Sequence, residues 1–144
     1  MIFTKHGRSG MMSAPHHLAA EAGANILRAG GNAVEAMVAA AATIAVVYPH
    51  MNSIGGDGFW IISEPGKEPI GIDACGPAAA LATVDAYKRA NCDSIPARGP
   101  LAALSVAGTL SGWASALDVA SSWGTAIPLP DILADAVGHG RAGV

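Results

Sequence analysis

Charged residues are scarce in this 144-residue chain, at 13% of the sequence, and aromatic residues reach only 5%. The formal net charge is −3, and the eight lysines and arginines form no run longer than two. The chain therefore lacks the basic patch that binds nucleic acid and the cationic face that binds anionic lipid. We expect neither nucleic acid nor a membrane among its partners.

Cysteine is also nearly absent. The two cysteines, Cys75 and Cys92, are too few and too far apart for a zinc knuckle, and we interpret them as small apolar fillers that stay reduced. No two histidines have the i, i+4 spacing of a helical metal site, so we expect no metal and no other cofactor. The first residues carry charges where a secretory signal needs an apolar core, which favours a cytoplasmic location.

No apolar run is long enough to span a membrane. The longest, residues 36–47, is interrupted by Thr43 and closed by Tyr48 and Pro49, whereas a span needs about 20 apolar residues. We interpret it as part of a buried helix. A hydrophobic content of 51% with so few charges indicates a surface that further chain or a partner subunit covers. Residues 1–144 therefore read as one incomplete domain with no internal boundary.

The stretch from residue 28 to residue 60 organises the rest of the pattern. Gly30 and Gly31 allow the left-handed geometry that ends one helix, and Asn32 can cap the next, which runs from Ala33 to Val47 with almost no polar face. Ser13 and Thr83 are further candidate caps. The pattern predicts an arm or short strand over residues 1–12, helices at 13–28, 33–47, 84–91, 109–122 and 131–137, and strands at 59–63, 70–74 and 101–106. We therefore expect an α+β fold, an antiparallel sheet covered by helices on at least one side.

Two residues are candidate substrate contacts. Asp57 lies in the turn Gly55–Gly58, where its carboxylate either caps backbone N–H groups, the commoner role, or contacts substrate. Arg98 lies in a loop bounded by proline and glycine and either clamps a substrate carboxylate or is simply solvated, as surface arginines usually are. The glycine turn is not a phosphate loop, because it precedes a strand and lacks a following Lys-Ser or Lys-Thr.

Several ordered blocks resemble the start of the γ-glutamyltransferase family of self-processing N-terminal-nucleophile (Ntn) amidohydrolases. The resemblance covers residues 11–144, and its blocks are SAPHHLAAEAGANILRAGGNAVEA, VVYPHMNSIGGDGFW, LSVAGTLSGW and SSWGT. It implies an incomplete four-layer αββα sandwich and a precursor that cleaves itself into a large and a small subunit. The new N-terminal threonine of the small subunit would be nucleophile and, through its α-amine, base.

That threonine would lie downstream of Val144, so these residues hold no catalytic group of their own. The expected partners are a small amide or acyl substrate and the small subunit; a homo-oligomer of the processed heterodimer is left open. Family members that act on γ-glutamyl groups carry an Arg-Glu pair where this chain has residues 73–77, DACGP. This departure resembles the acylase and oxamate-amidohydrolase-like branch.

Three hypotheses follow. The first is the N-terminal large-subunit segment of an amidohydrolase or acyltransferase, inactive by itself. The second is a catalytically silent truncated product that persists as an association module. The third, a free-standing ligand-binding domain, needs a closed core, and the unfinished C-terminus that we expect argues against it.

Overall fold

The computed structural model describes residues 4, 6–102, 105–124 and 126–144. The chain forms two compact units. The first contains residues 1–54 and 113–144, and the second contains residues 55–112. Helix α4 (Thr109–Ala120) has its first turn in the second unit and its remainder in the first.

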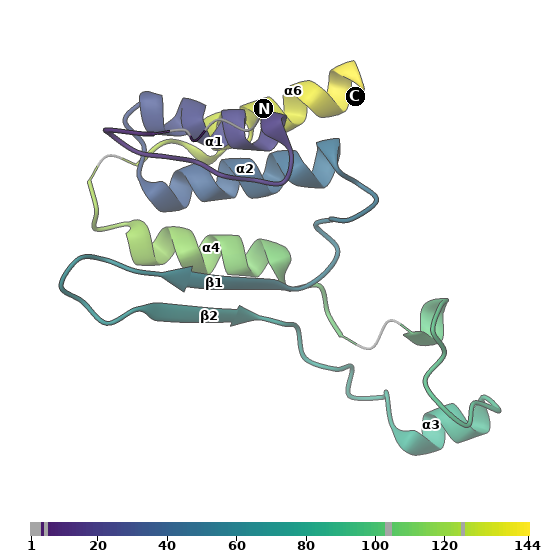
Figure 1. The fold of residues 1–144 in the computed structure, drawn as a ribbon. Helices are drawn as coiled ribbons and strands as arrows, with labels where there is room; N and C mark the ends of the chain where they lie inside the picture. The colour runs from purple at the N-terminus through teal and green to yellow at the C-terminus, as the bar shows by residue number, and fades with distance from the viewer. Residues whose placement is uncertain (1–3, 5, 103–104, 125) are drawn as a thin grey trace. The chain divides into compact units, whose positions relative to one another are not determined.

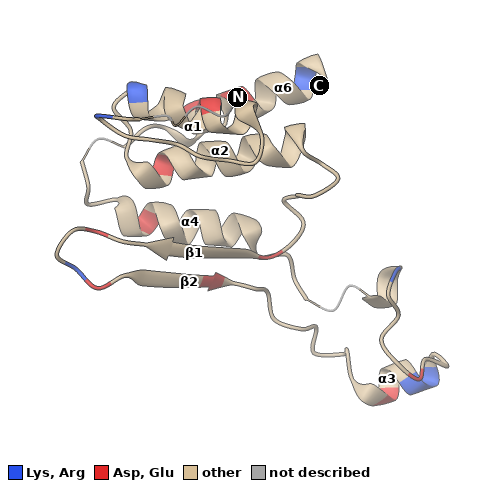
Figure 2. Ribbon diagram, viewed as in Figure 1, with Lys and Arg blue, Asp and Glu red and all other residues tan. Residues whose placement is uncertain are grey.

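Helix α2 (Ala33–Val47) is the centre of the first unit. It packs against α1 (His17–Arg28; Figure 1) and α6 (Ala134–Ala142). It also makes a smaller contact with α5 (Leu129–Ile132). Ten of its 15 residues are buried, which confirms the helix expected over these residues. Figure 2 shows how little charge it carries.

Small residues let α1 and α2 approach closely. A Cβ added to Gly23 of α1 would lie 2.8 Å from the carbonyl oxygen of Ala36. Gly30 then ends α1 with a φ of 89°, and the N–H of Gly31 donates to the carbonyl of Ile26 (2.9 Å). The helix end predicted at Gly30 and Gly31 is thus confirmed.

Asn32 caps α2 as predicted. Its Oδ1 accepts the backbone N–H groups of Val34 and Glu35, both at 3.0 Å, and Glu35 Oε2 accepts the N–H of Asn32 in return (2.8 Å). This is a complete capping box. The other carboxylate oxygen of Glu35 accepts the N–H of Ile127 (2.8 Å), so a side chain only 3% exposed joins segments 92 residues apart.

In the second unit, β1 (Gly58–Ile62) and β2 (Ile70–Ala74) form an antiparallel hairpin with Trp60 opposite Ile72. The antiparallel pairing predicted for these two strands is confirmed, but β1 is covered on one face only. Phe59 and Ile61 point to the opposite face from Trp60 and are 72% and 85% exposed, because residues i and i+2 of a strand share one face.

Beyond the hairpin lie α3 (Val84–Arg89), capped by Thr83 as predicted, and the 3₁₀ turn η1 (Pro100–Ala102). The strand predicted at residues 101–106 is wrong: Ser105 makes only an isolated bridge to Ala78, and residues 103–104 lie outside the described part. An apolar run after Pro100 was insufficient evidence for a strand without a partner to pair with.

Three other boundaries differ from the sequence analysis. The described part of residues 1–12 holds no strand, and α1 begins at His17 with His16, not Ser13, as its cap. The single helix predicted at 131–137 is two, divided at Leu133. None of the helices formed by described residues combines the length and apolar character that crossing a bilayer requires.

Thr43 lies at the centre of α2, is fully buried, and its hydroxyl has no hydrogen-bond partner among the described residues. Thr43→Val removes that hydroxyl at nearly constant shape, so we expect the free energy of unfolding to rise by about 1 kcal/mol, measured by urea denaturation.

The matched control is Thr109→Val. The Thr109 hydroxyl is buried but donates to the carbonyl of Gly56 (2.7 Å), so this substitution should destabilise the chain by about 1 kcal/mol or more. If both variants shifted the unfolding midpoint in the same direction, the orphaned state of the Thr43 hydroxyl would be contradicted.

Candidate functional site

The glycine turn before β1 is fastened to the start of α4. The carbonyl of Gly56 accepts the N–H groups of Gly108 (3.0 Å) and Thr109 (2.9 Å), together with the Thr109 hydroxyl. A Cβ on Gly108 would collide with the carbonyl of Ala74, and one on Gly76 with the carbonyl of Val106. Glycine is therefore required at both positions for the backbones to approach this closely.

The same arrangement places Asp57 beside Cys75, immediately after β2. The Cys75 thiol donates to Asp57 Oδ2 (3.4 Å), and the Cys75 N–H donates to Asp73 Oδ1 (2.9 Å). Both Asp57 and Cys75 are exposed. Among the described residues, the Asp57 carboxylate accepts a hydrogen bond from this thiol and none from a backbone N–H. The structure therefore does not show Asp57 as a backbone cap.

The neighbouring carboxylate changes the chemistry of the thiol. The pKa of Cys75 is raised above its usual value. The largest cause is the hydrogen bond to Asp57, followed by the negative charge of Asp57, desolvation and the charge of Asp73. Each disfavours the thiolate. The interpretation of Cys75 as an apolar filler is therefore wrong. Residue type gave no signal for this pair, because it depends on the turn and the strand end meeting in space.

Arg98 is exposed in the loop before η1. Within the described residues it makes no ion pair with Asp57 or with any other carboxylate. The structure thus leaves the Arg98 guanidinium available to solvent and does not bring the two candidate residues into contact.

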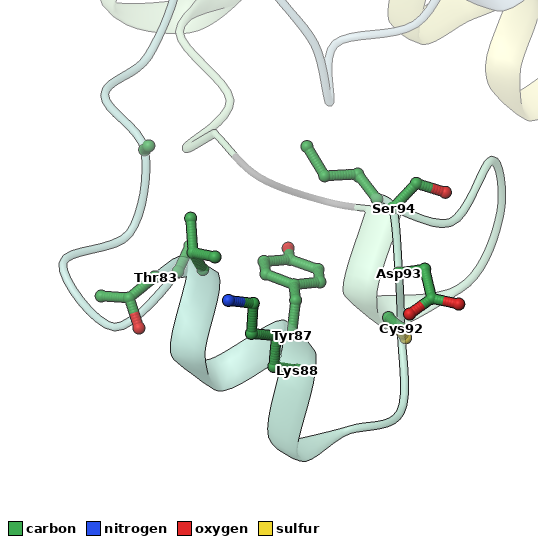
Figure 3. A pocket seen from close by; sticks show the side chains of 10 residues that line it. Thr83, Tyr87, Lys88, Cys92, Asp93 and Ser94 are labelled. Carbon is green, nitrogen blue, oxygen red and sulfur yellow. The ribbon is translucent and has the colours of Figure 1, made fainter.

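A cavity of about 370 Å³ lies between α3 and residues 92–95 (Figure 3). Tyr87 stands in its wall and donates its hydroxyl hydrogen to the carbonyl of Leu101 (2.7 Å), which ties α3 to η1. Lys88 and Cys92 also line it, but Arg98 does not. Sequence reasoning missed this cavity, since nothing in the pattern showed that α3 and residues 92–95 face each other.

The described residues contain no group of three or more histidine, cysteine, aspartate or glutamate side chains arranged to hold a metal ion.

Comparison with known proteins places this geometry in a family. The family model described as gamma-glutamyltranspeptidase matches residues 19–144. The oxamate amidohydrolase proenzyme of Klebsiella pneumoniae is 57% identical over 94% of this chain and 25% of its own length. The acylase ACY 1 proenzyme of Pseudomonas sp. (strain V22) is 34% identical over 95% of this chain and 25% of its own length.

A crystal structure of Helicobacter pylori gamma-glutamyltranspeptidase superimposes with a TM-score of 0.79 and 31% identity, over 94% of this chain and 38% of that one. The fold class is therefore the expected one: an incomplete α+β Ntn-hydrolase sandwich of helices and a strand hairpin. The chain belongs to the γ-glutamyltranspeptidase family.

The predicted branch is also confirmed, because both an oxamate amidohydrolase and an acylase are among the relatives. The chain spans about a quarter of the length of these two proenzymes.

The Cys75–Asp57 pair makes a prediction about thiol reactivity. Asp57 raises the pKa of Cys75, so less thiolate is present at a given pH below that pKa. Asp57→Asn removes the charge, lets the pKa fall back toward its ordinary value, and should speed alkylation of Cys75 by iodoacetamide several-fold at pH 8.

Cys92, whose thiol lies 3.6 Å from the carbonyl of Ala90, is the internal control, and its rate should not change. Mass spectrometry of the two labelled peptides measures both rates in one sample. An Asp57→Asn chain that labels Cys75 at the original rate would show that the carboxylate does not act on the thiol.

Proposed function

We propose that residues 1–144 form the N-terminal part of the large subunit of a self-processing amidohydrolase that hydrolyses a small amide such as oxamate. The observation that carries this proposal is the 57% identity with an oxamate amidohydrolase proenzyme across 94% of the chain. In this proposal both compact units belong to one domain.

The nucleophile is a threonine downstream of Val144, in the small subunit that processing releases. Its hydroxyl attacks the amide carbonyl while its own α-amine takes the hydroxyl proton. The amide nitrogen leaves as ammonia, and water then hydrolyses the acyl-enzyme ester. For oxamate the products are oxalate and ammonia, and no redox partner is needed. These 144 residues alone are inactive.

Oxamate is an amide joined directly to a carboxylate, so its site needs a cation. The Arg98 guanidinium is exposed and unpaired among the described residues, and a planar guanidinium can hold a carboxylate through two hydrogen bonds. Asp57 would repel the carboxylate, so we assign it to the amide end, where it can accept an N–H. The absence of arginine from residues 73–77 supports a substrate other than a γ-glutamyl compound.

The partner in this proposal is the small subunit. Phe59 and Ile61 present an apolar face of the hairpin that no described residue covers, and a polypeptide surface of the processed partner suits it. Both cysteines are free thiols, which supports a reducing location such as the cytoplasm.

A chimeric proenzyme tests the proposal. The Klebsiella oxamate amidohydrolase proenzyme is made with its matching 136-residue segment replaced by that of this chain. We expect the chimera to cleave itself into two subunits, seen by gel electrophoresis, and to release ammonia from oxamate within about tenfold of the parent rate, since a tenfold loss is only about 1.4 kcal/mol of transition-state stabilisation.

The parent proenzyme is the positive control, and a chimera with the matching acylase segment tests whether any family member suffices. Cleavage without ammonia release would reject the oxamate class while retaining the family role. A chimera that neither cleaves nor reacts, beside an active parent, would leave the silent association module as the better account.

Arg98→Ala in the active chimera should raise KM for oxamate about tenfold or more while leaving self-cleavage unchanged, because the lost interaction is a charge-assisted hydrogen bond to substrate. Arg89→Ala is the matched control, an exposed arginine at the end of α3, and should leave KM unchanged. Equal KM values for the two variants would remove Arg98 from the site.

A further inference from the structure

Three histidines and a tyrosine gather where α1 begins and α2 ends. The rings of His16 and His17 stack with centroids 4.7 Å apart, His16 lies 6.3 Å from Tyr48, and Tyr48 meets the ring of His50 edge-on at 4.3 Å. All four belong to the first compact unit. None of them has a part in the function proposed above.

His16 has a structural task that depends on its charge. It is the N-cap of α1, with extended backbone angles, and its Nδ1 accepts the N–H of Leu18 (3.3 Å). A nitrogen that accepts a hydrogen bond must carry a lone pair, so this arrangement requires the neutral imidazole with its proton on Nε2. Serine, aspartate and asparagine, the usual caps, carry no such requirement.

Protonation would oppose the cap in three ways. The imidazolium has no acceptor at Nδ1, so the Leu18 N–H would lose its partner. A positive charge at position 16 would meet the positive end of the α1 dipole. The His17 ring lies 4.7 Å away in the stack, and the two rings repel each other when both carry a proton.

The surrounding groups supply little compensation. Helix α1 carries Glu21 and Arg28, and α2 carries Glu35 and is followed by Tyr48 and His50. Helix α6, which packs against α2, carries Asp135, His139 and Arg141. Among the described residues none of these carboxylates makes an ion pair with either histidine of the stack.

We propose that the His16 cap, with its stacked partner His17, is an acid-sensitive lock on the first turn of α1. The lock is closed while His16 is neutral and opens when the imidazole takes a proton. Histidine is the side chain whose unperturbed form changes charge between pH 5 and 8, so a pH series across that range tests the lock. The turn that it releases is the one that abuts Tyr48 at the end of α2.

The test uses the whole 144-residue chain and its His16→Asn variant, because asparagine keeps a side-chain acceptor at the cap at every pH. In a series of ¹⁵N–¹H spectra from pH 8 to pH 5, the Leu18 amide resonance of the wild type should shift with the same midpoint as the His16 ring. In the variant, the Leu18 resonance should lose that transition.

Thermal unfolding followed by circular dichroism gives a second readout. Between pH 8 and pH 5 the wild-type melting temperature should fall by about 3 °C more than that of His16→Asn, as expected for loss of one helix cap in a chain of this size. His17→Gln should keep the pH-dependent shift of the Leu18 amide but show a smaller acid-induced fall in melting temperature. His139→Gln, on α6, should leave the amide shift and the melting temperature as in the wild type.

A Leu18 amide that is insensitive to pH while the His16 ring titrates would overturn the proposal. So would a His16→Asn chain with the same acid-induced fall in melting temperature as the wild type. If His139→Gln abolished the fall, the acid response would belong to α6 and not to this lock.

Discussion

The buried carboxylate of Glu35 is the interaction on which the first compact unit depends. Each of its oxygens accepts one backbone N–H, from Asn32 at the start of α2 and from Ile127 in the segment that leads to α5. Both bonds are to a group that is almost fully buried, so hydrogen bonding compensates the desolvation of the carboxylate. The space beside it is tight: a Cβ on Gly31 would lie 2.9 Å from Glu35 Oε2 and 2.8 Å from Ile127 Cδ1. The block GGNAVE therefore specifies a turn, a cap and a distant connection with six residues.

In the second unit, the glycine turn before β1 holds distant segments together as Glu35 does in the first. The carbonyl of Gly56 collects two backbone N–H groups and the Thr109 hydroxyl, while glycine at positions 76 and 108 lets the backbones pass. The blocks that mark the family in this chain are thus mostly scaffold. Asp57 and Arg98 are the exceptions in our proposal, since both side chains remain exposed at the ends of that scaffold. This division agrees with a large-subunit segment whose chemistry is completed by another part of the protein.

The features that the sequence predicted correctly are those determined by residues close together in the chain. The Asn32 and Thr83 caps, the helix over Ala33–Val47 and the second strand of the hairpin follow from residue type and spacing within a few positions. The failures involve contacts between distant residues or competing caps. His16 and not Ser13 is the cap, because the imidazole Nδ1 of His16 accepts the N–H of Leu18 and α1 begins only at His17. The Cys75–Asp57 pair joins positions 18 residues apart. Residue type alone identified Asp57 and Arg98 as candidates, but only the fold showed that the two side chains do not contact each other.

The central claim is that these residues are the front part of a self-processing amidohydrolase, and the most direct measurement is of the mature protein purified from its own cells. Intact-mass analysis and N-terminal sequencing should find residues 1–144 within a polypeptide heavier than 14.3 kDa, co-purifying with a second polypeptide whose first residue is threonine. A single species of 14.3 kDa with no threonine-led partner would contradict the account.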